Sequence, residues 1–179
     1  MARCLIIGCG CRGRLLTREL RAAGHAVRGT TRSVQRMDDI DAAGAEAVLA
    51  DPDRVATLVD SFAHVSVVCV LLGSAAGSPA ELAALHGTRL DMLLTKLVDT
   101  TVRGVVYEAR GTVEASVLAG GAERVRHFAQ RSLASYALLD ADPAVPDQWL
   151  AAAVAGVEGV IGVREEARSS PTGQPRSEP

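Results

Sequence analysis

Short apolar runs rich in valine, leucine and isoleucine alternate with longer stretches of helical periodicity from the N-terminus to about residue 163. The short runs predict six strands, at residues 3–7, 26–29, 47–50, 65–72, 104–107 and 136–139. The longer stretches predict helices at residues 13–23, 34–43, 53–63, 79–100, 113–133 and 147–161. Strand and helix are therefore expected to alternate along nearly the whole chain.

The composition of the strands indicates how they are arranged. Residues 65–72 form an almost unbroken apolar run, which is typical of a strand covered by helices on both faces of a parallel sheet. Because crossovers between parallel strands are right-handed, we predict an α/β fold with a single doubly wound parallel six-stranded sheet, the Rossmann fold, in strand order 3-2-1-4-5-6. One domain is expected over residues 1–164, followed by a disordered tail at residues 165–179.

Composition and charge narrow the classes of function. The 179 residues are enough for one ordinary domain and too few for two independent catalytic domains. With 19 basic and 21 acidic residues, the chain lacks the basic excess that nucleic-acid binding on a large scale needs. No apolar run reaches the ~18 residues of a membrane span. We therefore expect a cytoplasmic protein with no nucleic-acid or membrane partner.

The strongest chemical signal is the glycine-rich run at residues 8–13, Gly-Cys-Gly-Cys-Arg-Gly, directly after the first expected strand. Gly8 permits the tight turn, Gly10 lets a pyrophosphate approach the backbone, and Gly13 lets the helix press against the strand. The amides at the start of the helix, including those of Cys11 and Arg12, would then bind the diphosphate. The alternative is that these glycines only allow close packing.

The end of the second expected strand indicates which dinucleotide is bound. A site for NAD usually offers a carboxylate to the ribose hydroxyls about 20 residues beyond the glycines. This chain has Thr31 and Arg32 there instead, and its next acid is Asp38. A guanidinium would accept the 2′-phosphate of NADP, so NADP is favoured over NAD. The alternative for Arg32 is a solvated residue at the start of a helix.

The loop at residues 8–13, the Gly-His-x-Val-x-Gly-x-x-Arg run at residues 24–32, and Asp51 resemble the extended and atypical short-chain dehydrogenase/reductase superfamily, including its NmrA-like relatives. Residues 87–89, 93–94 and 104–107 are similar to the stretch in which nucleotide-sugar epimerases run from the fourth helix into the fifth strand. The resemblance implies that Asp51 hydrogen-bonds the adenine amine and that residues 73–77 lie near the nicotinamide ribose. An N-cap is the alternative role for Asp51, and Leu72 and Gly73 complete the expected cofactor site.

The catalytic pair of that superfamily is missing. Its reductases use a tyrosine whose phenol is acidified by a lysine four residues later. Here Gly111 follows Tyr107 at that distance, Asp140 follows Tyr136, and Met92 precedes Lys96, which is the sole lysine. Extended members also add a substrate-binding lobe after the sixth strand, whereas residues 140–146 lead here into one last helix. Only the nucleotide-binding half is therefore expected.

Candidate catalytic residues follow the fifth expected strand, at the edge of the sheet where ligands bind. They are Glu108, Arg110 and Thr112. Glu108 and Arg110 could form an acid/base pair, or an exposed ion pair without catalytic function. His86 is expected to be a surface or packing residue rather than a general base. No metal site is expected, since Asp140, Asp142 and Glu108 are weak candidates for one.

The cysteines suggest one further hypothesis. Cys9 and Cys11 lie beside the positive end of the first expected helix, which lowers the pKa of a nearby thiol. Oxidation of either thiol would put bulk where the diphosphate belongs, so we hypothesise redox control of nucleotide binding. Cys4 and Cys69 are expected to be inert core thiols.

These features leave several functions open. The first is an NADP(H)-binding Rossmann protein that acts as an atypical NADPH-dependent oxidoreductase on an unknown small molecule. The second is a non-catalytic NADP-sensing or regulatory module that acts through a protein partner. A third is a sheet whose pocket binds no nucleotide. Trp149 is expected to pack the last helix against the sheet or against a twin subunit, which leaves a homodimer open.

Overall fold

The six predicted strands form one fully parallel sheet in the order β3-β2-β1-β4-β5-β6, which confirms the doubly wound Rossmann fold. The computed structural model describes residues 1–169, with side chains as far as residue 162. The strands are β1 (Arg3–Ile7), β2 (Ala26–Thr31), β3 (Glu46–Leu49), β4 (Val67–Val70), β5 (Gly104–Glu108) and β6 (Ser135–Leu139). Strand order reverses between β1 and β4, so the carboxyl ends of these two strands define the place where ligands of such sheets bind.

The helical segments are α1 (Cys11–Ala22), η1 (Val34–Arg36), α2 (Met37–Ala42), η2 (Val55–Phe62), α3 (Pro79–Ala84), η3 (Leu85–Arg89), α4 (Leu90–Leu97), α5 (Ala115–Ser132) and α6 (Pro146–Ser169). The expected start of the fourth helix is confirmed, because Ser78 and Glu81 form a reciprocal capping box ahead of α3. No helix among the described residues has the length and apolar character needed to cross a membrane.

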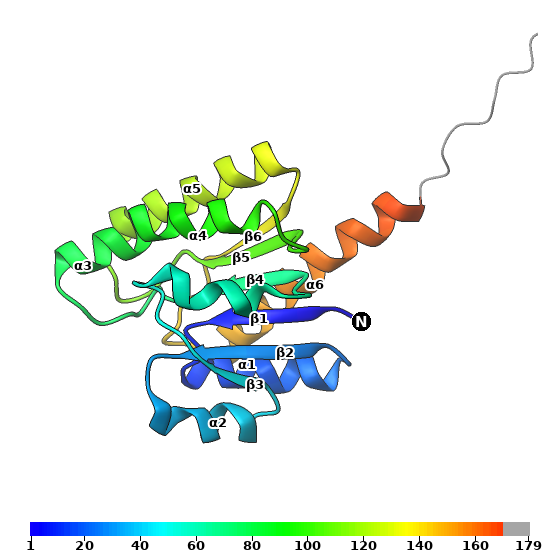
Figure 1. Cartoon of the computed structure of the whole chain (residues 1–179), viewed down its shortest axis with the longest axis horizontal. Coiled ribbons are helices and arrows are strands. Elements are labelled where there is room, and N and C mark those ends of the chain that lie inside the picture. The colour runs from blue at the N-terminus through cyan, green and yellow to red at the C-terminus, as the bar shows by residue number, and fades with distance from the viewer. Residues whose placement is uncertain (170–179) are drawn as a thin grey trace, which may run out of the picture.

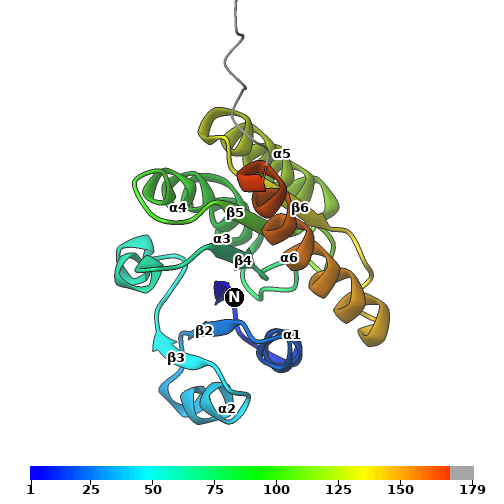
Figure 2. The ribbon, with the colours of Figure 1, turned by 90° about the vertical axis from the view of Figure 1, so that its right-hand side faces the viewer.

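The helices cover both faces of the sheet (Figures 1 and 2). Alternate side chains of β1 enter two separate cores, as the period of a strand requires. Leu5 and Ile7 pack with η2, α4 and α5 on one face. Cys4 and Ile6 pack with α1, α2 and α6 on the other. Trp149 is fully buried in the second core, so it packs α6 against the sheet.

The predicted α-helix at residues 53–63 is wrong, because this segment is the 3₁₀ helix η2. The hydroxyls of Thr57 and Ser61 donate to the carbonyl oxygens of Arg54 and Leu58, three residues earlier. Hydroxyl side chains compete in this way with the α-helical backbone pattern.

The predicted continuous helix at residues 79–100 is also wrong, because the π turn η3 interrupts it at Gly87 (φ −107°, ψ −106°). The widened turn accompanies the burial of His86 against the sheet.

The last helix, α6, extends to Ser169, beyond the expected domain boundary at residue 164. The rest of the predicted tail, residues 170–179, lies outside the described residues.

Candidate functional site

The turn between β1 and α1 requires glycine at its first position. Gly8 has a φ of +82°, and a Cβ atom there would lie 2.6 Å from the carbonyl oxygen of Leu71 on the neighbouring β4 segment. The Gly8 amide donates to Thr30 Oγ1 at 3.3 Å, and the Cys9 amide donates to the Thr30 carbonyl at 3.0 Å. The turn is therefore held against β2 on one side and the end of β4 on the other.

The first turn of α1 presents unpaired amides. Its N-cap is Gly10, which has no side chain to accept a hydrogen bond, and the first helical bond runs from the Arg14 amide to the Gly10 carbonyl at 2.9 Å. The amides of Cys11, Arg12 and Gly13 have no acceptor among the described residues. Together with the partial positive charge at the helix start, they suit an anion.

These amides border a cavity of about 390 Å³ at the carboxyl ends of β1, β2 and β4. Its lining consists of residues 8–13, 30–32, 36, 50, 52, 53, 71, 72, 74–76, 81, 82 and 85. The cavity thus lies where strand order reverses, which is where doubly wound sheets bind their ligands, and it includes the loop at residues 8–13 that was expected to bind the diphosphate.

Most of the predicted cofactor residues line the cavity. They are Gly8, Gly10, Cys11, Arg12, Gly13, Thr31, Arg32 and Leu72. Asp51 and Gly73 do not line it. Asp51 Oδ1 accepts a hydrogen bond from the Asp53 amide at 3.1 Å, so its side chain caps the following turn, in line with the alternative stated for it. Asp53, which the sequence analysis missed, lines the cavity instead.

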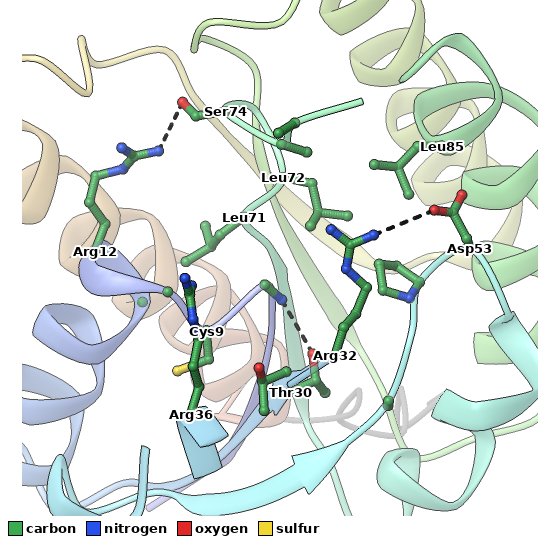
Figure 3. Close-up of a pocket in the computed structure, with 18 of the residues that line it drawn as sticks. Cys9, Arg12, Thr30, Arg32, Arg36, Asp53, Leu71, Leu72, Ser74 and Leu85 are labelled. Atoms are coloured by element: carbon green, nitrogen blue, oxygen red, sulfur yellow. Dashed lines mark hydrogen bonds and ion pairs between the residues drawn. The ribbon is translucent and has the colours of Figure 1, made fainter. Parts of the chain in front are cut away.

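Two arginines border the cavity beyond β2. Arg32 has an exposed side chain and lies 3.9 Å from an oxygen of Asp53 (Figure 3). Arg36, on η1, also lines the cavity and was missed from the sequence. Arg32 precedes η1 and Arg36 ends it, so the available signal is that both arginines follow β2 closely in the chain. Glu81 also lines the cavity, and its pKa is lowered chiefly by hydrogen bonds with Ser78 and in addition by the positive charge of Arg32.

A buried polar cluster adjoins the cavity, and we call Arg12, Gly73, Ser74, Glu108 and Trp149 the Glu108 cluster. Glu108 is fully buried. Its Oε1 accepts hydrogen bonds from Arg12 Nη2 at 3.1 Å and Trp149 Nε1 at 3.0 Å, and its Oε2 accepts from the Gly73 amide at 2.7 Å. Arg12 Nη2 also donates to Ser74 Oγ at 3.0 Å, and its guanidinium lies 5.3 Å from the centre of the Trp149 ring. Every charge in the cluster is thus paired.

The three candidate catalytic residues do not meet in the cavity. Arg110 and Thr112 are exposed and lie outside its lining, and Arg110 forms an ion pair with Asp142 at 2.9 Å. The expected pairing of Arg110 with Glu108 is therefore wrong, because Glu108 bonds Arg12 in the interior. Among the described residues, no group of three His, Cys, Asp or Glu side chains is placed to hold a metal ion.

The two cysteines of the loop differ in exposure. Cys9 is buried against Gly29 and Thr17, and burial raises the pKa of its thiol despite the hydrogen-bonding distance to Thr17. The lowered pKa expected for Cys9 is therefore wrong. Cys11 is exposed, so the hypothesis of redox control narrows to that thiol. Cys4 and Cys69 are buried, and burial raises the pKa of Cys4 to about 12, as expected for inert thiols.

His86 is a buried packing residue that supports the cavity wall. Its Nε2 lies 3.2 Å from the carbonyl oxygen of Leu72, which can only accept, so Nε2 carries the proton. Nδ1 then accepts from the hydroxyl of Tyr107 at 2.7 Å. Burial lowers the pKa of His86 and raises the pKa of Tyr107. Tyr107, fully buried and committed to this bond, is not available as a proton donor in the cavity.

The neutral state of His86 predicts a loss of stability in mild acid. In the unfolded chain a histidine has a pKa of about 6.5, whereas burial lowers the pKa of His86 in the folded protein. Between these two values the unfolded state binds more protons, so the free energy of unfolding falls as the pH drops below about 6.5. We expect the melting temperature to fall more steeply with acidification in the wild type than in His86→Gln. Parallel curves for the two proteins would contradict this assignment.

Solved structures with a similar fold include nicotinamide-nucleotide complexes. A short-chain dehydrogenase/reductase superfamily protein from Agrobacterium tumefaciens with bound NAD is 22% identical, with a TM-score of 0.61 over 76% of this chain and 48% of that one. The triphenylmethane reductase of Citrobacter sp. complexed with NADP(H) is 18% identical, with a TM-score of 0.59 over 76% and 48%. The UDP-glucose 4-epimerase of Thermotoga maritima with UDP-glucose is 15% identical, with a TM-score of 0.62 over 76% and 54%.

These similarities confirm the resemblance to the short-chain dehydrogenase/reductase superfamily at the level of the fold. This chain spans about half the length of the solved structures that it matches. No family model matches the sequence, and no curated protein matches it significantly.

Proposed function

We propose that the chain binds NADP(H) in this cavity, and that it does so as a non-catalytic sensing or regulatory module. The observation that carries the proposal is the position of three unpaired amides, at Cys11, Arg12 and Gly13, on a cavity that is also lined by Arg32 and Arg36. The amides suit a diphosphate, and the two arginines suit a second, separate phosphate. Such a protein would report the state of the cofactor to a protein partner.

The preference for NADP over NAD rests on the charges beyond β2. Arg32 and Arg36 carry two positive charges, and two carboxylates line the same cavity, Asp53 beside Arg32 and Glu81, which accepts a hydrogen bond from the Ser78 amide at the start of α3. Asp53 lies next to Arg32, so its negative charge is partly compensated and Arg36 remains available for a 2′-phosphate. A ribose diol would gain less from this arrangement than from an unpaired carboxylate.

Replacing Arg32 with alanine is expected to weaken NADP binding by about 1–3 kcal/mol, or roughly 5- to 150-fold, because a charge-assisted hydrogen bond is lost. NAD binding should change little. Titration calorimetry with both cofactors measures the difference, and a thermal-shift series with NADP, NADPH and NAD gives an independent check.

The matched control is Arg54→Ala, which removes an exposed arginine of the neighbouring segment that does not line the cavity. It should leave both affinities unchanged. Equal losses for NADP and NAD in Arg32→Ala would show that Arg32 does not recognise the 2′-phosphate. Absence of any nicotinamide nucleotide binding to the wild type would refute the proposal itself and favour a purely structural sheet.

A second candidate function, an atypical NADPH-dependent oxidoreductase, has one observation in its favour. Ser74 lines the cavity and bonds Arg12, so its hydroxyl could polarise a carbonyl. Against it, Arg110 and Thr112 are outside the cavity. Steady oxidation of NADPH with a panel of carbonyl or imine substrates would support the oxidoreductase, whereas binding without turnover would support the sensing module.

A further inference from the structure

The cavity covers the first half of the fold, β1 to β3, and reaches into the second half only as far as the segment after β4. A doubly wound sheet provides two mononucleotide-binding halves, and a dinucleotide crosses from the first half to the second at the reversal of strand order. Here the lining comes from the segments that follow β1, β2, β3 and β4, and it ends at Leu85. Within the described residues, none from β5, β6, α5 or α6 contributes to it.

The second half is closed by the Glu108 cluster. Glu108 ends β5, at the point where a ligand that crosses from β4 would reach the next strand. Its two oxygens accept hydrogen bonds from α1, from the loop after β4 and from α6, through Arg12, Gly73 and Trp149. The carboxylate therefore ties together the elements between which the second mononucleotide would have to enter.

Backbone contacts close the same region. The Gly73 carbonyl accepts a hydrogen bond from the Val113 amide at 3.0 Å, and the backbones of Gly73 and Gly111 are so close that a Cβ on Gly111 would collide with the Gly73 carbonyl. The ion pair between Arg110 and Asp142 joins the loop after β5 to the loop after β6. Little room is left between the loops that follow β4 and β5.

We infer that the site recognises the adenosine diphosphate moiety of its ligand, and that a nicotinamide mononucleotide half gains no binding energy from it. The inference rests on the proposed function and specifies which part of the nucleotide is bound. ADP and its 2′-phosphorylated form, 2′-phospho-ADP, are thus ligands in their own right. When NADP binds, its nicotinamide ring stays in solvent, which is consistent with a module that senses nucleotide without hydride transfer.

Arg12 contacts the far end of the bound adenosine diphosphate moiety. It lines the cavity, and its Nη2 is committed to Ser74 and Glu108. Its Nη1 has no hydrogen-bond partner in the described part of the chain, where side chains end at residue 162, so we assign this donor to a terminal phosphate. Because Glu108 and the Trp149 ring fix the guanidinium in place, this donor is preorganised and cannot follow a longer ligand into the second half.

The test is calorimetry on the full chain with ADP, 2′-phospho-ADP, NADP and nicotinamide mononucleotide, together with the nicotinamide fluorescence of NADPH. We expect 2′-phospho-ADP, which keeps both the diphosphate and the 2′-phosphate, to bind within about fivefold of NADP, a difference of about 1 kcal/mol. Nicotinamide mononucleotide should not bind, and NADPH emission should stay unchanged on binding. NADP binding more than about fivefold tighter than 2′-phospho-ADP, or an altered NADPH emission, would overturn the inference and leave the proposed function intact. If no adenine nucleotide binds, both fail.

A variant pair supplies a second measurement. Arg12→Gln should weaken 2′-phospho-ADP and NADP by the same factor, because Arg12 contacts the diphosphate that the two ligands share. Arg18→Gln, the same substitution at an exposed arginine of α1 outside the cavity, should leave both affinities unchanged. A loss confined to NADP would show that Arg12 contacts the nicotinamide half and would overturn the inference. If Arg12→Gln does not fold, the comparison of ligands with the wild type decides alone.

Discussion

Replacing Glu108 with alanine is expected to lower the free energy of unfolding by about 3–5 kcal/mol, as the removal of one partner from a buried ion pair typically does. The carboxylate is fully buried and accepts hydrogen bonds from Arg12, Trp149 and Gly73. Without it, a guanidinium, an indole N–H and a backbone amide lose their acceptor in the interior. For a chain of this length the melting temperature should fall by about 6–20 °C.

Two control variants separate the causes of this loss. Glu108→Gln keeps the size of the side chain and one acceptor oxygen but removes the charge, so it should be less destabilising than Glu108→Ala. Arg110→Ala breaks the half-exposed ion pair with Asp142, keeps the hydrogen bond from the Ala144 amide to Asp142, and should cost less than about 1 kcal/mol. If Glu108→Ala unfolds at the same temperature as Arg110→Ala, the Glu108 cluster does not anchor α1, β5 and α6 to one another.

The fold was predictable because the signals that specify it are local. The alternation of apolar strands with amphipathic helices gives the strand count, and the handedness of parallel crossovers then leaves the observed strand order. The two errors in helix type have local causes that apolar periodicity does not report. In η2, the hydroxyls of Thr57 and Ser61 bond the backbone, and at η3 the turn widens beside the buried His86.

The candidate site was predictable only in part. The glycine loop is contiguous, so the spacing of Gly8, Gly10 and Gly13 was sufficient to place it. The Glu108 cluster was not, because Arg12 and Glu108 are 96 residues apart in the chain and Trp149 lies 41 residues beyond Glu108. Pairings between distant residues depend on how α1, β5 and α6 pack, and no local pattern encodes that packing.

Replacing Gly8 with alanine is expected to lower the free energy of unfolding by about 2–5 kcal/mol, through backbone strain together with overpacking. The φ of +82° is a conformation that L side chains rarely adopt. The added Cβ would also lie 2.6 Å from the Leu71 carbonyl oxygen, which belongs to the backbone and cannot rotate away. Thermal or denaturant unfolding measures the loss, and calorimetry should show that nucleotide binding is lost with it, since the turn aims the amides of α1 at the cavity.

Gly24→Ala is the matched control, because Gly24 has nearly the same φ of +85° but open space around its added Cβ. Gly24→Ala measures the backbone strain alone, which we expect to lower the free energy of unfolding by about 1–2 kcal/mol. Its nucleotide affinity should stay unchanged. The excess loss in Gly8→Ala then measures the contact between the β1–α1 turn and the end of β4. Equal losses in the free energy of unfolding of the two variants would mean that this contact does not hold the turn in place. Retained nucleotide binding in Gly8→Ala would mean that the phosphate site does not depend on the conformation of the turn.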